Sequence, residues 1–187
     1  MMTVDGAAGL DLEGVSTEEP TVKPEDAQSY ENAALIGKEK LASSGFFVNI
    51  VKRGSLPAPE GPPLILVVED EAGTAAVIDA VLKKNGYSTR LAANLHEIKR
   101  ALSQRPAPNL ILLDIMLPDA NGFAVLERLR RHPELGQTPV VMLTSLSDPA
   151  DVAKGLALGA TGYMSKPARP QALIGAIRNA LGTEQAA

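Results

Sequence analysis

The chain has 187 residues, 45% of them hydrophobic, no cysteine and a formal net charge of −4, which suits one ordinary domain with an extension and excludes disulfides, thiolate metal sites and a cysteine nucleophile. Nine acidic residues and three lysines give residues 1–40 a charge of −6, whereas residues 41–187 carry +2, so no concentrated basic face favours direct binding of nucleic acid. No apolar run approaches the roughly 18–20 residues of a membrane span and no signal-peptide pattern is present, so we expect no membrane insertion and a cytoplasmic protein.

Residues 1–62 are predicted to form an acidic, poorly ordered extension that ends in a stiff, proline-rich linker. Within it, residues 27–41 could form a short helix, although Gly37 weakens that prediction, and Tyr30–Leu41 is the part of it that could dock. The apolar segment FFVNIV (46–51) could be a strand or a docking segment. We expect these two segments to dock either on a partner or on the domain that follows.

From Leu64 onward, apolar strands alternate with amphipathic helices. Continuous Val/Ile/Leu runs are typical of parallel strands that helices cover on both faces. The strands are expected to begin at 64 and to lie at 88–92, 110–113, 140–143 and 161–164. The helices are expected at 73–85, from 94, and at 122–131, 149–158 and 170–181. Five βα units predict a doubly wound α/β domain over residues 63–183 with five helices and a five-stranded parallel sheet, and residues 184–187 are a tail.

Four of the strands end in side chains with useful chemistry, namely Glu69 with Asp70, then Asp114, Thr144 and Lys166. Because functional groups gather at the carboxyl ends of parallel strands beside a topological switch point, we expect these side chains to converge. Three carboxylates in one crevice need a cation, and hard oxygen ligands favour Mg²⁺. Each acid alone could simply cap a helix, and a lone strand-end threonine would be ordinary.

Asp114 lies at the tip of the central strand, which suits in-line attack on a phosphoryl group. Mg²⁺ and Lys166 would offset the charge on the phosphoryl oxygens. The Thr144 hydroxyl can donate a hydrogen bond to one of those oxygens.

The ordered set Glu69-Asp70, Asp114 within DIMLPDANG, Thr144-Ser145, Tyr163 and Lys166-Pro167 resembles the receiver domain of two-component response regulators, the CheY-like family, over about residues 63–183. The resemblance implies a flavodoxin-like sheet of strand order 2-1-3-4-5. It also implies a phosphoacceptor switch rather than an enzyme, with only self-catalysed phosphotransfer and slow autodephosphorylation.

By this resemblance, Asp114 accepts a phosphoryl group from a sensor histidine kinase or a phosphotransfer protein. Glu69, Asp70, Asp114 and the backbone carbonyl of Met116 would bind Mg²⁺, with Glu69 standing where many relatives have Asp. Thr144 would follow the phosphoryl group and Tyr163 would turn inward when it is present. That movement would alter the face made by the fourth helix, fifth strand and fifth helix of the domain, and so switch partner binding.

Met116 and Leu146 stand two residues beyond Asp114 and Thr144. The resemblance implies that these positions tune the lifetime of the acyl phosphate. Our hypothesis is that the two apolar side chains hinder the attacking water and give a long-lived phosphorylated state.

The leading interpretation is a single-domain response regulator that acts on a downstream protein target, with a homodimer on phosphorylation left open. An intermediate phosphorelay receiver, passing the phosphoryl group to a phosphotransfer protein, is the alternative. A phosphatase that forms an aspartyl-phosphate would need a second acid where Met116 stands. A flavodoxin-like carrier is disfavoured because the acidic run Glu69–Glu71 would repel the phosphate of FMN.

Overall fold

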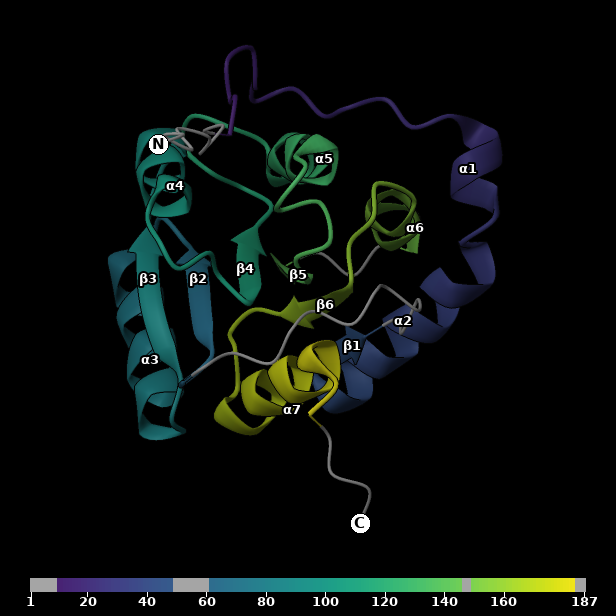
Figure 1. Cartoon of the computed structure of the whole chain (residues 1–187). Coiled ribbons are helices and arrows are strands. Elements are labelled where there is room, and N and C mark those ends of the chain that lie inside the picture. Colours follow the sequence, from purple (N-terminus) through teal and green to yellow (C-terminus); the bar gives the residue numbers. More distant parts are fainter. Residues whose placement is uncertain (1–9, 49–60, 146–148, 184–187) are drawn as a thin grey trace.

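The computed structural model describes residues 10–48, 61–145 and 149–183 (Figure 1). In this part of the chain a sheet lies between two layers of helices. Its strands are β1 (Phe46–Val48), β2 (Leu64–Val68), β3 (Ser88–Ala92), β4 (Leu110–Asp114), β5 (Val140–Thr144) and β6 (Gly162–Ser165). The helices are α1 (Pro24–Gln28), α2 (Glu31–Ser44), α3 (Ala72–Lys84), α4 (Leu95–Ser103), α5 (Gly122–Arg131), α6 (Pro149–Ala157) and α7 (Pro170–Leu181).

The described strands form a six-stranded sheet in the order β1-β6-β5-β4-β2-β3. From β2 to β6 all pairings are parallel, and these five strands have the predicted order 2-1-3-4-5. The prediction of a five-stranded sheet was wrong because β1 adds a sixth strand, antiparallel to β6. An edge strand exposes unpaired backbone groups, and β1 satisfies those of β6.

Two apolar cores lie on opposite faces of the sheet. Strand residues such as Leu66, Ile111 and Met142 point to one face and pack with α4, α5 and α6. Their neighbours in the strands, such as Ile65 and Leu112, point to the other face and pack with α3 and α7. Burial of both faces explains why the strands read as uninterrupted apolar runs.

Side chains and backbone geometry at the helix ends agree with the sequence patterns. The Asn94 side chain accepts a hydrogen bond from the Glu97 amide (2.9 Å), and Glu97 accepts one from the Ala93 amide (2.8 Å), which is a capping-box arrangement shifted by one residue. Gly86 follows α3 with a φ of 83°, the left-handed conformation expected after a helix. These local signals fix where α3 ends and α4 begins.

The prediction that the N-terminal extension is poorly ordered was wrong for residues 10–48. Leu10 and Leu12 are buried in the same core as α4, α5 and α6. The Arg128 guanidinium donates a hydrogen bond to the carbonyl of Glu13 (3.0 Å), and the Asn121 amide donates one to the carbonyl of Ser16 (2.9 Å). The burial of a few apolar side chains in an existing core stabilises this segment, although its overall composition is polar.

Figure 1 shows this extension, in purple and dark blue, passing across α5 to α1 and then along α2 to β1. The predicted helix is present as α2 and continues through Gly37. Residues 49–60 lie outside the described residues, and they include most of the expected linker LPAPEGPP (56–63) and the end of the segment FFVNIV (46–51). Among the residues described, no helix combines the length and the apolar character that crossing a membrane requires.

Replacing Leu113, a fully buried side chain in the central strand β4, by Ala should lower the free energy of unfolding by about 2–5 kcal/mol, because it leaves a cavity between packed layers. The matched change Leu91→Ala, in the edge strand β3 where 45% of the side chain is exposed, should cost less than about 1 kcal/mol. Urea denaturation of both variants measures the difference. Equal losses would contradict the assignment of Leu113 to the core.

Candidate functional site

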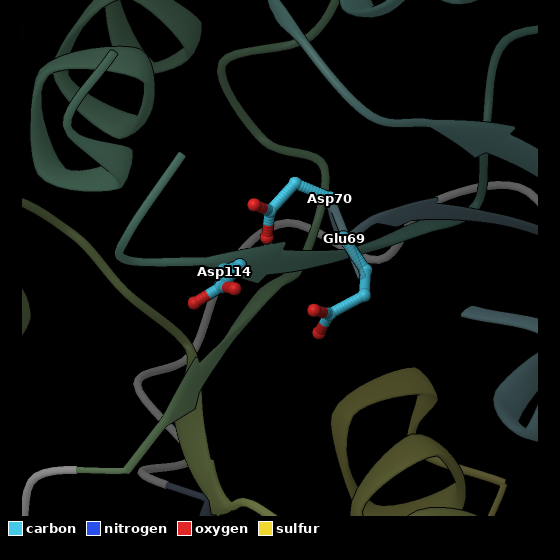
Figure 2. A group of neighbouring side chains, drawn as sticks. All are labelled: Glu69, Asp70 and Asp114. Carbon is cyan, nitrogen blue, oxygen red and sulfur yellow. The ribbon is translucent and has the colours of Figure 1, made fainter. Parts of the chain in front are cut away.

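Three carboxylates gather at the carboxyl ends of β2 and β4, the topological switch point of the sheet. One oxygen from each of Glu69, Asp70 and Asp114 lies within 4.8 Å of the other two. Figure 2 shows the three side chains reaching into the same space beyond the strand ends. Glu69 and Asp114 are buried and Asp70 is exposed. The predicted convergence of the acidic residues is therefore confirmed.

Lys166, which follows β6, completes the cluster. Its ammonium group donates a hydrogen bond to Asp114 Oδ2 (2.8 Å) and another to Glu69 Oε1 (2.9 Å). Glu69 Oε2 is also 2.9 Å from the same nitrogen. The peptide bond between Lys166 and Pro167 is cis. One lysine thus bridges carboxylates that come from two different strands.

The environment shifts the pKa values of two members of the cluster. Burial raises the pKa of Glu69 and the charge of Asp114 adds to the rise, while Lys166 opposes it. Burial alone would lower the pKa of Lys166, but its hydrogen bonds to Asp114 and Glu69 outweigh burial and raise it. Lys166 is therefore held in its charged form, which keeps a permanent cation beside Asp114.

The residues of the cluster fit a hard divalent cation. Three carboxylates and one ammonium group leave an excess of negative charge at the strand ends. Glu69 Oε2 is buried and accepts no hydrogen bond within the described part of the chain, although it lies 2.9 Å from the Lys166 ammonium group. Buried polar atoms normally accept or donate hydrogen bonds, and a carboxylate oxygen that accepts none is a natural metal ligand. The donor set is all oxygen, as Mg²⁺ prefers.

Met116 lies in the loop after β4 with 68% of its surface exposed. Its amide donates a hydrogen bond to Asp114 Oδ1 (3.1 Å), and the loop closes through the Leu117 amide and the Ala120 carbonyl (3.2 Å). The loop and Lys166 therefore hold different oxygens of the Asp114 carboxylate, Oδ1 and Oδ2 respectively. The other position expected to tune the phosphoryl lifetime, Leu146, lies outside the described residues.

Thr144 is buried at the carboxyl end of β5, between the ends of β4 and β6. Its carbonyl accepts a hydrogen bond from the Lys166 amide (2.8 Å), which places the backbone of both residues side by side. Ser145 after it is exposed. The structure therefore brings Thr144 to the same edge as Asp114 and Lys166.

Tyr163 points inward from β6 and is fully buried. Its hydroxyl donates a hydrogen bond to the carbonyl of Asp151 in α6 (3.0 Å), and burial with the nearby Asp151 charge raises the pKa of this hydroxyl. A Cβ at Gly155 would overlap the tyrosine hydroxyl, so the ring fits only because α6 has no side chain there. Gly155 carried no signal in the sequence that would mark it as the partner of Tyr163.

Replacing Lys166 by Met should lower the free energy of unfolding in metal-free buffer by roughly 2–4 kcal/mol, because two buried carboxylates lose their shared cation. The second change Glu69→Gln should restore part of this loss by removing one of the repelling charges. Lys83→Met is the control, since the Lys83–Asp79 ion pair lies on the surface and is worth less than about 1 kcal/mol. A loss for Lys166→Met no larger than the control, by urea denaturation, would contradict the importance of the bridge.

Comparison with known proteins places this site in a family. Residues 65–178 match the model of the response regulator receiver domain. The chain is 36% identical over 121 residues, 65% of its length, to the transcriptional regulatory protein GltR of Pseudomonas aeruginosa and covers 50% of that protein. It spans about half the length of the curated relatives it matches.

Two solved structures resemble the chain closely in fold. The chemotaxis response regulator CheY4 of Vibrio cholerae matches with a TM-score of 0.60 and 28% identity, over 64% of this chain and 99% of that one. The receiver domain of a sensor histidine kinase from Pseudomonas aeruginosa, solved with a magnesium ion coordinated in its active-site cleft, matches with a TM-score of 0.58 and 28% identity, over 65% and 99%. The chain belongs to the receiver domain family of two-component response regulators, and its fold is the CheY-like α/β fold.

Proposed function

We propose that this protein is a single-domain response regulator in which Asp114 accepts a phosphoryl group from a phosphohistidine. The donor is a sensor histidine kinase or a phosphotransfer protein. The observation that carries the proposal is the bridge from Lys166 to Asp114 (2.8 Å) inside a cluster of three carboxylates. The receiver spans residues 63–183, with residues 1–62 as an N-terminal extension and 184–187 as a tail.

In the proposed reaction, a carboxylate oxygen of Asp114 attacks the phosphorus atom. An O–P bond forms as the N–P bond to the donor histidine breaks, and the imidazole nitrogen keeps the electron pair and takes up a proton. Lys166 stabilises the negative charge on the transferred group, because its ammonium already lies at Asp114 Oδ2. The Thr144 hydroxyl, at the neighbouring strand end, donates a hydrogen bond to a phosphoryl oxygen.

Mg²⁺ would be held by the carboxylates of Glu69, Asp70 and Asp114 and by the backbone carbonyl of Met116, and it supplies positive charge that offsets the phosphoryl oxygens. Glu69, which is longer than Asp, suits this metal-binding role. Its longer side chain reaches both the shared space and Lys166. Glu69 would then both bind the metal and, together with Asp114, orient the lysine.

We further propose that phosphorylation switches the face formed by α6, β6 and α7 through Thr144 and Tyr163. A phosphoryl group adds charge and strong acceptors at the end of β4. Tyr163 lies on β6 beneath this face and is hydrogen-bonded to α6, so a displaced Thr144 and a moved α6 would change what the face presents. A downstream protein, or a second copy of the chain, would respond to that change.

A phosphorelay role is the second candidate. One structure that the chain resembles is itself the receiver domain of a sensor histidine kinase. A relay receiver would pass its phosphoryl group on to a histidine of a phosphotransfer protein, and rapid loss of the group to such a protein would distinguish this role from a terminal switch.

Incubation with acetyl phosphate and Mg²⁺ should add one phosphoryl group to the protein, measured by intact mass spectrometry. Asp114→Ala should abolish the gain. Asp119→Ala is the matched control, because Asp119 lies in the same loop but hydrogen-bonds the Leu95 amide instead of Lys166, and it should leave the gain unchanged. Absence of the gain in the unaltered protein would mean that the site does not accept phosphate from this donor class and would count against the proposal.

Met116→Asn and Leu146→Asn should each speed the loss of the phosphoryl group, by about tenfold if the barrier falls by roughly 1.4 kcal/mol. Both changes replace an apolar side chain, two residues beyond Asp114 or Thr144 in the sequence, with one that can orient water. The decay of the phosphorylated mass after removal of acetyl phosphate measures the rate. An unchanged decay rate in both variants would contradict the hypothesis that these two side chains prolong the phosphorylated state.

A further inference from the structure

The face formed by α6, β6 and α7 is covered by the N-terminal extension of the same chain. α1 and α2 pack against α6, and β1 pairs with β6 and also contacts α7. Figure 1 shows α2 and β1, in blue, beside the yellow α7 and the end of β6. The surface proposed above to meet a partner is therefore occupied already.

Backbone pairing fixes the position of the extension on β6. Phe47 stands opposite Tyr163 in the antiparallel pair. α2 ends at Gly45 with a φ of 82°, and the Gly45 carbonyl accepts a hydrogen bond from the Ser165 amide (2.9 Å) and one from its hydroxyl (3.2 Å). The sharp turn at Gly45 lets one short segment present a helix to α6 and a strand to β6.

Two glycines of the receiver leave room for the extension. A Cβ at Gly162 in β6 would overlap the Phe47 carbonyl oxygen, and a Cβ at Gly175 in α7 would lie 3.0 Å from the Phe46 ring. Two separate elements of the receiver therefore leave room for the same segment. This fit is what a built docking site shows, as opposed to a chance contact.

Apolar contacts contribute most of the stabilisation of the extension on this face. Ala34 and Leu41 of α2 are buried in the same core as Val152, Leu156 and Tyr163. Outside this core, Lys154 of α6 pairs with Glu19 of the extension (2.6 Å), and such partly exposed ion pairs are weak and salt-sensitive. The burial of Leu41 therefore matters more than the ion pair.

We propose that residues 24–48 are an intramolecular occupant of the α6–β6–α7 face, so that a partner or a second receiver can use this face only after it displaces them. The face accepts a segment with an apolar helix side followed by an edge strand, and a competing partner must offer the same chemistry. The proposal rests on the proposed function in one respect, namely that this face is the output surface of the receiver.

Amide hydrogen exchange in the full chain, read by NMR, tests this occupancy. The Ser165 amide is bonded to the extension, whereas the next amide, of Lys166, is bonded within the receiver to Thr144 (2.8 Å). Leu41→Glu should speed exchange at Ser165 by at least about tenfold and leave Lys166 protected. Leu35→Glu is the matched control on the exposed side of α2, since 55% of Leu35 is exposed against 3% of Leu41, and it should change neither amide.

Phe46→Glu, which disturbs β1 without altering the receiver, gives a second route to the same result if Leu41→Glu fails to fold. Fast exchange at Ser165 in the unaltered protein, or equal exchange in the buried and exposed variants, would overturn the proposal. Phosphoryl uptake measured on the same variants keeps the two ideas separate. If the protein takes up a phosphoryl group but residues 24–48 do not occupy the face, the proposed function stands. If residues 24–48 occupy the face but no phosphoryl group is taken up, only the phosphoacceptor chemistry is refuted.

Discussion

The ion pairs of Lys166 are the interaction on which this arrangement depends. Asp114 and Glu69 are buried carboxylates at the ends of adjacent strands. Two negative charges so close together are costly unless a cation neutralises them. Lys166 supplies that cation from the end of β6. The preceding residue, Ser165, carries the hydrogen bonds to Gly45 of the extension. The carboxylate cluster and the covered face are thus connected by two consecutive residues.

Much of the receiver could be predicted from the sequence, because its signals are local or depend on a general rule of sheet topology. The continuous apolar runs predicted parallel strands, and the acids that follow β2 and β4 predicted a shared site at their carboxyl ends. Asn94 and Gly86 marked helix boundaries through hydrogen-bonding and backbone geometry that neighbouring residues determine. The family resemblance added the expected roles of individual residues, which remain predictions.

The extension could not be predicted in the same way, because its order comes from contacts distant in sequence. Nothing in the acidic segment around Leu10 and Leu12 indicates that both would enter the core. The strand FFV pairs with β6, which is distant in sequence, so its own sequence left open whether it docks on the receiver or elsewhere. Gly155 and Gly162 leave space for Tyr163 and Phe47. This role depends on contacts that form only in the folded chain, so the sequence alone does not indicate it.

The most direct test of the central claim is to identify the residue that carries the phosphoryl group. Borohydride reduces an acyl phosphate on aspartate to the alcohol, and peptide sequencing by mass spectrometry then locates the converted residue. After treatment with acetyl phosphate and Mg²⁺, the account predicts conversion at Asp114 alone. Conversion at Asp70 or Asp119, or phosphate retained on His96 or His132, would contradict the assignment of Asp114 as the phosphoacceptor.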